Sequence, residues 1–414
     1  MSHRTVVVGA SIGGVRTAQA LRRGGYAGEV VLVDADSEPP YDRPPLSKAM
    51  LSKAMLLDGA EATPTLLTYE QAAASDIRLE LGVAAHSLGV AAGTVDLADG
   101  RRLAFDDVVL ATGSAARPSP WGRPEGLHVL RSLADARALR ADLRRGGRVV
   151  VVGAGFIGAE VASAATSLGL AVSVVDPLPV PMGRVVGDEV GRVFERLHQR
   201  NGVSTYFGSG VEDVRSLPGG LTVTLTDGTR LDADTVVVGI GASPNQRWLE
   251  SSGLLLDDGV VCDEFCRAVG QPRVHVVGDL ARWHHQRHAE WVRVEHWTNA
   301  VEQASCVAHN IDNPGALRAC VPVEYVWSDQ YDQKIQLAGR PWRGARWEML
   351  GDPDVDPRFA VLWADEDGVL CGAMSVNWPK ATVASRRALA AGGKLEAVRD
   401  GLPAARADAG AAAR

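Results

Sequence analysis

The sequence predicts an α/β protein with two doubly wound nucleotide-binding domains and a C-terminal α+β domain. A strand, a glycine-rich turn and a helix follow one another near residue 5, and the same order returns near residue 149. Beyond residue 323, short runs with the composition of strands prevail. A chain of 414 residues is also long enough for about three domains of ordinary size.

The first of these patterns lies at the start of the chain. Thr5–Val8 is a short β-rich apolar run, and a helical spacing of apolar residues from Val15 to Leu21 ends at Gly24. Glu29–Val33 is the next expected strand. The order strand, turn, helix, strand is typical of the beginning of a doubly wound parallel sheet.

The second pattern repeats the first. We expect a strand at Val149–Val152, a helix at Phe156–Leu168 and a strand at Ala171–Val175. Two units of this kind in one chain indicate two dinucleotide-sized folds, and both are predicted to be Rossmann-like.

The remaining segments set the expected domain boundaries. Leu103–Gly113 has the pattern of one strand, the connector at 118–124 is rich in proline and glycine, and Val274–Val277 is another apolar strand. The expected organisation is a discontinuous first domain at 1–113 and 243–320, a second domain at 114–242, a C-terminal α+β domain at 321–400 and a flexible tail at 401–414.

Composition excludes several classes of protein. The formal net charge of −7 argues against a nucleic-acid binder, because phosphate neutralisation needs a basic surface. The sequence shows no apolar run typical of a membrane span or a cleaved leader. Five cysteines without a CxxC pair favour reduced thiols and a cytoplasmic location.

The first glycine motif contains Gly9, Gly13 and Gly14, with Ser11 at the position where a second glycine is usual. Such a motif needs a tight turn, close approach of the backbone to a pyrophosphate, and close packing of helix on strand. Asp34 follows 20 residues after Gly14, at the end of the next strand. The alternative is a glycine-rich turn of an ordinary α/β protein.

The second motif is complete, with Gly153, Gly155 and Gly158, and Asp176 closes the following strand. A carboxylate there accepts a hydrogen bond from a ribose 2′-hydroxyl and repels a 2′-phosphate. The next residues, Pro177 and Leu178, supply no cation for a phosphate. NADH is therefore favoured over NADPH.

Together the two motifs indicate more than either does alone. A chain with two dinucleotide sites can keep one dinucleotide bound while another binds and leaves. This is what a flavoenzyme reduced by a nicotinamide requires.

Through both glycine motifs, Ala111-Thr112-Gly113 and Val276-Val277-Gly278-Asp279, the chain resembles the flavoprotein reductases with two dinucleotide-binding domains. The runs at 41–48 (YDRPPLSK) and 327–332 (WSDQYD) resemble the NADH-dependent ferredoxin reductases of the putidaredoxin and rhodocoxin reductase type. The resemblance implies tightly bound FAD, NADH as substrate and a [2Fe–2S] ferredoxin as acceptor, which feeds a cytochrome P450 or a ring-hydroxylating oxygenase.

The resemblance also implies site residues. Lys48 and Glu160 would pair near the nicotinamide and form the catalytic pair. The FAD-binding positions would be Gly9, Ser11, Gly13, Gly14, Asp34, Arg43, Lys48, Ala85, Thr112, Gly113, Arg131, Gly278, Asp279, Trp297 and Trp327. The NAD-binding positions would be Gly153, Gly155, Ile157, Gly158, Glu160, Asp176 and Gly241.

Several alternatives stay open. Asp36 rivals Asp34 as the acid that reads the FAD ribose, and Lys53 rivals Lys48, because the segment LSKAM occurs twice in tandem. Lys48 is otherwise a solvated surface lysine, and Glu160 an acid favoured in the first turn of a helix. Trp297 and Trp327 are otherwise core or interface aromatics.

Cysteine and histidine positions exclude two further functions. Cys262 is the first cysteine in the chain, so the CxxxxC pair of a disulfide reductase is absent. The histidine-rich segment at 282–288 lacks an acid or cysteine at metal-ligand spacing, so we expect no metal site.

The acceptor has two alternatives. Rubredoxin or another carrier is an alternative to ferredoxin, and a flavin-bearing sensor with weak reductase activity is an alternative from another class. Since ferredoxins of this family are acidic, the candidate docking contacts are basic. They are Arg282, Arg287, Arg293, Arg340, Arg343 and Arg346.

Overall fold

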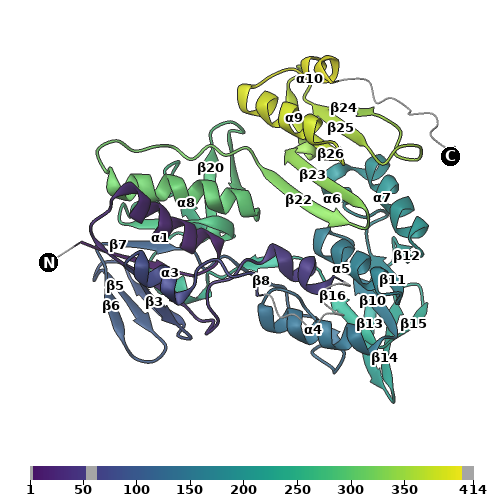
Figure 1. The fold of residues 1–414 in the computed structure, drawn as a ribbon, viewed down its shortest axis with the longest axis horizontal. Coiled ribbons are helices and arrows are strands. Elements are labelled where there is room, and N and C mark those ends of the chain that lie inside the picture. The colour runs from purple at the N-terminus through teal and green to yellow at the C-terminus, as the bar shows by residue number, and fades with distance from the viewer. Residues whose placement is uncertain (1–2, 53–62, 403–414) are drawn as a thin grey trace. The chain divides into compact units, whose positions relative to one another are not determined.

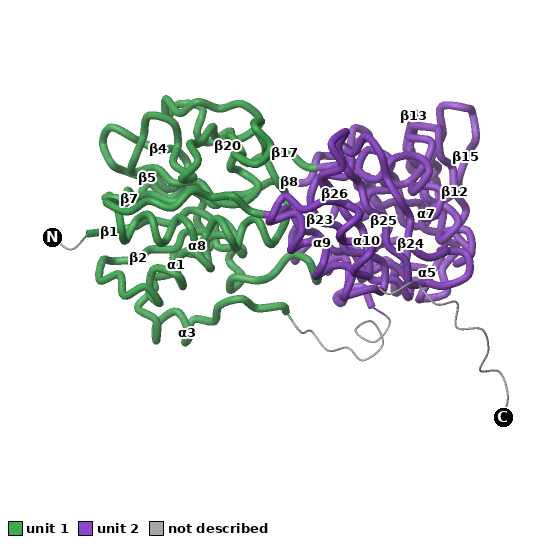
Figure 2. Tube along the Cα trace, turned by 90° about the horizontal axis from the view of Figure 1, so that it is seen from above, with its two compact units in different colours: residues 1–45, 62–115, 242–322 green, residues 46–61, 116–241, 323–414 purple. Residues whose placement is uncertain are grey.

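The computed structural model describes residues 3–52 and 63–402, which belong to two compact units. The first unit comprises residues 1–45, 62–115 and 242–322, and the second comprises residues 46–61, 116–241 and 323–414 (Figure 2). Each unit contains a five-stranded parallel sheet of its own. Among the described helices, none combines the length and the apolar character needed to cross a membrane.

The parallel sheet of the first unit has the strand order β19-β7-β1-β2-β3. Apart from the edge strand β3, its strands are largely buried and rich in valine, as expected for a parallel sheet that is covered on both faces. Their bounds are β1 Arg4–Val8, β2 Glu29–Asp34, β3 Ile77–Leu81, β7 Asp107–Leu110 and β19 Val274–Val276.

Helices cover one face of this sheet. α1 (Ile12–Gly24) and α8 (Trp297–Asp312) lie side by side although nearly 300 residues separate their starts (Figure 1). Val15, Ala18 and Leu21 of α1 join the core on this side, as their spacing predicts. The short helix α3 (Tyr69–Ala74) packs near β3.

Small sheets cover the other face, where their apolar residues share one core with β1, β2 and β7. One is antiparallel, and the second joins β18 and β20 in parallel and β20 and β21 antiparallel. β8 and β17 form a separate two-stranded sheet. The bounds are β4 Ala85–Gly89, β5 Thr94–Leu97, β6 Arg102–Ala104, β8 Ser114–Ala116, β17 Ala242–Pro244, β18 Val260–Cys262, β20 Ala281–His285 and β21 Glu290–Arg293.

The second unit contains the other parallel sheet, with the order β12-β11-β10-β16-β9. Its strands are β9 Leu127–His128, β10 Arg148–Val152, β11 Ala171–Asp176, β12 Ser204–Phe207 and β16 Thr235–Val238. The helices of this region are α4 Leu133–Arg145, α5 Phe156–Ser167, α6 Gly183–Val186 and α7 Asp188–Arg200. An antiparallel meander packs on the sheet through a shared core, and its strands are β13 Val211–Leu217, β14 Gly220–Leu225 and β15 Arg230–Ala233.

The C-terminal part of the second unit is an antiparallel sheet with the order β22-β23-β26-β25-β24. Its strands are β22 Tyr325–Gln330, β23 Gln333–Gly339, β24 Arg346–Leu350, β25 Phe359–Ala364 and β26 Leu370–Val376. One face packs on α9 (Pro379–Ala391) and α10 (Leu395–Gly401), and the other face shares a core with α6 and α7. All six residues of β25 are buried because both faces are covered.

The predicted fold class is confirmed: two Rossmann-like parallel sheets and a C-terminal α+β region are present. The prediction of one strand over Leu103–Gly113 was wrong. The chain forms two strands there, β6 and β7, which belong to different sheets. Hydrophobic periodicity does not reveal this break, because Phe105 is buried and continues the apolar pattern between the two strands.

Candidate functional site

The first glycine turn connects β1 to α1, and the surrounding backbone requires its glycines. Gly9 has φ +109°, and a Cβ atom there would lie 2.3 Å from the carbonyl oxygen of Ala111. A Cβ on Gly14 would lie 1.8 Å from the carbonyl oxygen of Gly9, and one on Gly13 would lie 3.0 Å from Val277 Cγ1. Helix, turn and strand therefore approach more closely than any side chain allows.

Asp34 fixes this turn from the end of β2. Its Oδ2 accepts a hydrogen bond of 2.5 Å from the amide of Ala10, and its Oδ1 accepts one of 2.8 Å from the amide of Asp36. Asp36 in turn accepts 2.9 Å from the Tyr41 hydroxyl and 3.1 Å from the amide of Glu38. Both candidate acids thus lie beside the turn.

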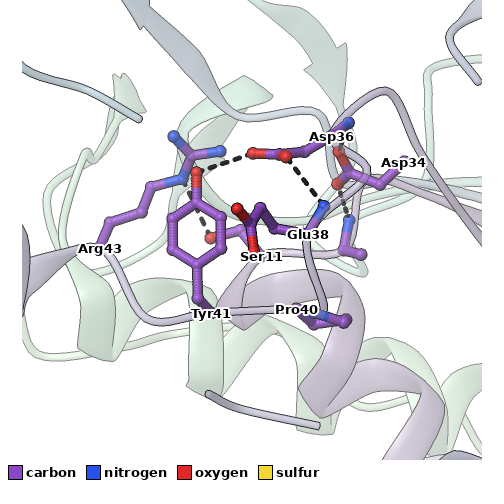
Figure 3. Close-up of a pocket in the computed structure, with 8 residues that line it drawn as sticks. Ser11, Asp34, Asp36, Glu38, Pro40, Tyr41 and Arg43 are labelled. Atoms are coloured by element: carbon purple, nitrogen blue, oxygen red, sulfur yellow. Dashed lines mark hydrogen bonds between the residues drawn. The ribbon is translucent and has the colours of Figure 1, made fainter. Parts of the chain in front are cut away.

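These residues enclose a pocket at the N-terminus of α1 (Figure 3). Arg43 donates from Nε to Ser11 Oγ at 3.2 Å, and its guanidinium lies 5.9 Å from the centre of the Tyr41 ring. A helix N-terminus and a cation suit phosphate, while carboxylates suit sugar hydroxyls. The lining residues are Ala10, Ser11, Asp34, Asp36, Glu38, Pro40, Tyr41 and Arg43.

A second group of predicted residues lies at the ends of β7 and β19 in the same unit. The Thr112 hydroxyl donates 3.1 Å to the carbonyl of Asn245, and the amide of Asn245 donates 2.9 Å to the carbonyl of Gly113. Gly278, with φ +76°, donates its amide to Gln303 Oε1 at 2.7 Å. Asp279 accepts 2.6 Å from the Ser114 hydroxyl.

Trp297 and Ala85 complete the first-unit set. Trp297 begins α8, and its indole Nε1 donates 2.8 Å to Asp42 Oδ1. Burial raises the pKa of Asp42, and the bond from Trp297 acts in the opposite direction. Ala85 begins β4, directly after a loop whose Val83 amide donates 3.0 Å to the carbonyl of Asp34.

The second glycine turn, between β10 and α5, repeats the first. Gly153 has φ +103°, and a Cβ atom on it would lie 2.3 Å from the carbonyl oxygen of Gly239. A Cβ on Gly158 would lie 1.9 Å from the carbonyl oxygen of Gly153. Gly155 differs, because the space around its Cβ direction is open to 4 Å. Ile157, in the first turn of α5, is 44% exposed.

Asp176 has the same role here that Asp34 has in the first unit. Its Oδ2 accepts 2.7 Å from the amide of Ala154, and its Oδ1 accepts 2.8 Å from the amide of Leu178. Gly241, with φ +100°, lies beyond β16 and accepts 2.9 Å from the amide of Arg117.

Lys48 and Glu160 form a buried ion pair in the second unit. Lys48 Nζ lies 2.6 Å from Glu160 Oε1, and the two side chains are 18% and 2% exposed. The Ser47 hydroxyl donates 2.5 Å to Oε2, and the Ser328 hydroxyl donates 2.6 Å to Oε1. Glu160 is therefore neither a solvated first-turn acid nor unpaired, and Lys48 is not a free surface lysine.

The sequence prediction missed Ser47, Ser328 and Gln330 as parts of this network. Ser328 and Gln330 are both completely buried, and the side-chain amide of Gln330 donates a hydrogen bond of 3.2 Å to the Ser328 hydroxyl. The available signal was their alternation on one face of β22, where two polar side chains replace the apolar ones that a core requires.

Comparison with known proteins agrees with this geometry. Residues 3–304 match the family described as pyridine nucleotide-disulphide oxidoreductase, and residues 325–405 match a family described as reductase C-terminal. The chain belongs to the pyridine nucleotide-disulphide oxidoreductase family.

Relatives within this family extend over nearly the whole chain. A component named anthranilate 1,2-dioxygenase system ferredoxin--NAD(+) reductase from Burkholderia cepacia is 37% identical over 94% of this chain and 94% of its own. Rhodocoxin reductase of Rhodococcus erythropolis is 33% identical over 93% and 89%. The solved covalent putidaredoxin reductase–putidaredoxin complex contains a chain that matches with a TM-score of 0.87 at 32% identity, over 94% of this chain and 93% of that one.

The predicted resemblance is thereby confirmed, and the protein is an oxidoreductase of this family that depends on FAD and NAD(H). Both turns fit dinucleotides, because each offers a glycine-lined backbone and a helix N-terminus where a pyrophosphate needs close approach.

Not all positions implied for FAD fall in the first unit of this oxidoreductase. Lys48, Arg131 and Trp327 belong to the second. Arg131 directly precedes Ser132, which caps α4. The backbone amide of Arg131 donates a hydrogen bond of 3.1 Å to Asp135. Trp327 is half-buried in β22 and stacks on Tyr325 with ring centroids 6.2 Å apart. The rival Lys53 lies outside the described residues.

The expected basic docking contacts need a correction. Arg340 is only 6% exposed and donates 2.8 Å to Glu324, so its proposed role as a surface contact was wrong. Neighbouring acids also pair with Arg282, Arg293 and Arg346. The sequence shows positive charges but not the acids that folding brings beside them. The side chain of Arg343 lies outside the described part of the structure.

Proposed function

We propose that this protein is an FAD-dependent NADH:ferredoxin oxidoreductase whose acceptor is a [2Fe–2S] ferredoxin. Two glycine turns of the same geometry, in separate units of one chain, carry the proposal. Relatives named as ferredoxin--NAD(+) reductase components of dioxygenase systems support the choice of acceptor. Such a ferredoxin would feed a ring-hydroxylating oxygenase or a cytochrome P450, and a cytoplasmic location suits this role.

In this proposal the first turn holds FAD and the second holds NADH. The FAD-binding domain would comprise residues 1–113 and 243–320, the NADH-binding domain 114–242 and the C-terminal domain 321–400, with a tail at 401–414. The FAD site would use the fifteen positions implied by the resemblance, and the NAD site the seven. Asp176 would favour NADH, since a carboxylate beside the ribose repels a 2′-phosphate.

FAD supplies the capacity to accept a hydride and to release its two electrons one at a time. The residues of the chain orient and shield the reactants. The two turns would bind pyrophosphates through backbone amides. The Lys48–Glu160 ion pair would lie beside the nicotinamide and would add no net charge there. Positioning rather than acid-base chemistry would give most of the rate.

Reduction of cytochrome c by NADH, with and without an added [2Fe–2S] ferredoxin, tests this function. We expect a yellow protein that reduces cytochrome c several-fold faster when ferredoxin is present, and faster with NADH than with NADPH. If the rates with and without ferredoxin are equal and transfer to rubredoxin is fast, the acceptor is rubredoxin and not ferredoxin. A preparation that binds no flavin would contradict the whole proposal.

A further inference from the structure

The carboxylate of Glu160 is held by three donors from two separate segments of the chain. Lys48 and Ser328 both donate to Oε1 at 2.6 Å, and Ser47 donates to Oε2 at 2.5 Å. The carboxylate is almost fully buried, and both serines are at most 2% exposed. A charge in such surroundings needs these donors, since water does not replace them.

The direction of the Ser328 hydroxyl follows from its neighbour. The side-chain amide of Gln330 donates to Ser328 Oγ at 3.2 Å, so the hydroxyl hydrogen is directed to Glu160. A hydroxyl that accepts one bond and donates another has no rotational freedom left. The result is a chain of hydrogen bonds from β22 to the carboxylate on α5.

The turn after β22 is attached to the same helix. The amide of Tyr331 donates 2.6 Å to the hydroxyl of Ser163, which lies three residues after Glu160 and therefore on the same face of α5. The Tyr331 hydroxyl lies 2.7 Å from His198 Nδ1 on α7. The β22–β23 turn thus contacts two helices of the nucleotide-binding fold.

The backbone at this turn has a tight geometry. Tyr331 has φ +56°, a left-handed conformation that an aromatic residue rarely adopts. A two-residue hairpin turn between Gln330 and Gln333 favours this conformation at its first position, and Tyr331 also contacts Ser163 and His198 there.

We infer that Ser328 and Ser47 are positioning residues for Glu160, and that the C-terminal hairpin is a working part of the hydride-transfer site. This inference rests on the proposed function, in which Glu160 lies at the nicotinamide. Loss of one hydroxyl leaves the Lys48 bond in place but lets the carboxylate rotate, so the reactants are held less well. Such a change affects the rate of hydride transfer more than the affinity for NADH.

The test is stopped-flow reduction of the FAD-loaded enzyme by NADH. For Ser328→Ala we expect a limiting rate about tenfold lower, in keeping with a hydrogen bond to a charged group, and a half-saturating NADH concentration changed less than about twofold. Ser328→Thr retains the hydroxyl and is expected to restore most of the rate.

Ser375→Ala is the matched control. Ser375 is 3% exposed in the same sheet and bonds Thr382 on α9, on the face away from α7. The inference is overturned if Ser328→Ala slows reduction no more than Ser375→Ala, or if it changes only the NADH concentration dependence.

Two further variants separate the possible failures. Ser47→Ala removes a bond from a different segment, so it is expected to show the same loss of rate even if Ser328→Ala does not fold. Glu160→Gln tests the proposed function itself. If flavin reduction is normal in Glu160→Gln, the role of Glu160 fails; if only Glu160→Gln is slow, the positioning role of the serines fails alone.

Discussion

The two glycine turns share a backbone but differ in what surrounds it. The first glycines have φ +109° and +103°, and a Cβ on the last glycine would lie 1.8 or 1.9 Å from a carbonyl oxygen. In each turn a strand-end aspartate accepts the amide after the first glycine, at 2.5 Å in one and 2.7 Å in the other. The shared features are therefore those that the backbone itself requires.

The differences lie in the side chains. At the middle position, Ser11 is bonded to Arg43 in the first turn, while Gly155 is open in the second. Two residues after the last glycine, the first helix carries Arg16 and the second the buried Glu160. In the proposed function, the turn bonded by Arg43 would hold the resident FAD, and the open turn would hold the dinucleotide that exchanges.

The largest effect is expected where the turns are alike. Gly14→Ala and Gly158→Ala each place a methyl group against backbone, and overpacking of this kind costs about 3 kcal/mol or more. Gly14→Ala should lose bound FAD, measured by flavin absorbance per protein. Gly158→Ala should retain FAD but lose reduction by NADH. Gly155→Ala, with open space, is the control and should fold normally; equal damage in all three variants would contradict the comparison.

Acid should affect the two units differently. Burial lowers the pKa of His198 from 6.5 to about 4, so the unfolded chain binds a proton that the folded chain excludes. The resulting stability of the second unit is complete above pH 6.5 and is lost as the pH falls to about 4, by up to about 3 kcal/mol. Urea unfolding at pH 7.5 and 5 should show this loss, and His198→Phe should reduce it.

The first unit offers the matched comparison. Burial alone would raise the pKa of Asp107, but hydrogen bonds from His275 and His3 outweigh it and hold that pKa below its usual value. Its contribution is present above pH 3.8 and disappears only below it. Release of FAD that precedes loss of the second unit on mild acidification would contradict this order.

A smaller effect is expected at the strand-end acids. Asp176 accepts two backbone amides, whereas asparagine has only one acceptor oxygen. Asp176→Asn should raise the NADH concentration needed for half-maximal rate about tenfold with FAD content unchanged, since one charged hydrogen bond is lost. Asp34→Asn should instead weaken the retention of FAD and leave the NADH concentration dependence unchanged. Titration with NADH and flavin absorbance after dialysis measure the two effects.

The smallest effect is expected from making the turns alike. Ser11→Gly removes the bond to Arg43 at a half-exposed position. FAD should dissociate roughly two- to fivefold faster, consistent with a net value near 1 kcal/mol for one hydrogen bond. Gly155→Ser makes the opposite change and should slow exchange of NAD+ by a similar factor. The rate of flavin release, measured by fluorescence, tests the prediction for Ser11→Gly.

Several features of the site could be predicted from local pattern. Both turns follow from glycines at fixed spacing between a valine-rich strand and a helix, because nearby residues alone determine that geometry. The pairing of Lys48 with Glu160, which the family resemblance suggested, is present in the structure. Arg340 is a counterexample. Its charge suggested a surface contact, but its side chain is buried and pairs with Glu324, sixteen residues earlier in the chain.

The sequence by itself determined the fold class and the two glycine turns, since these depend on residues close together in the chain. It left Asp34 and Asp36 as rival acids at the first turn. Only the tertiary structure decided that Ser47, Ser328 and Lys48 meet at one carboxylate, because up to 168 residues separate Glu160 from these donors. Hydrogen bonds of this range are selected by packing of whole elements. No local periodicity records them.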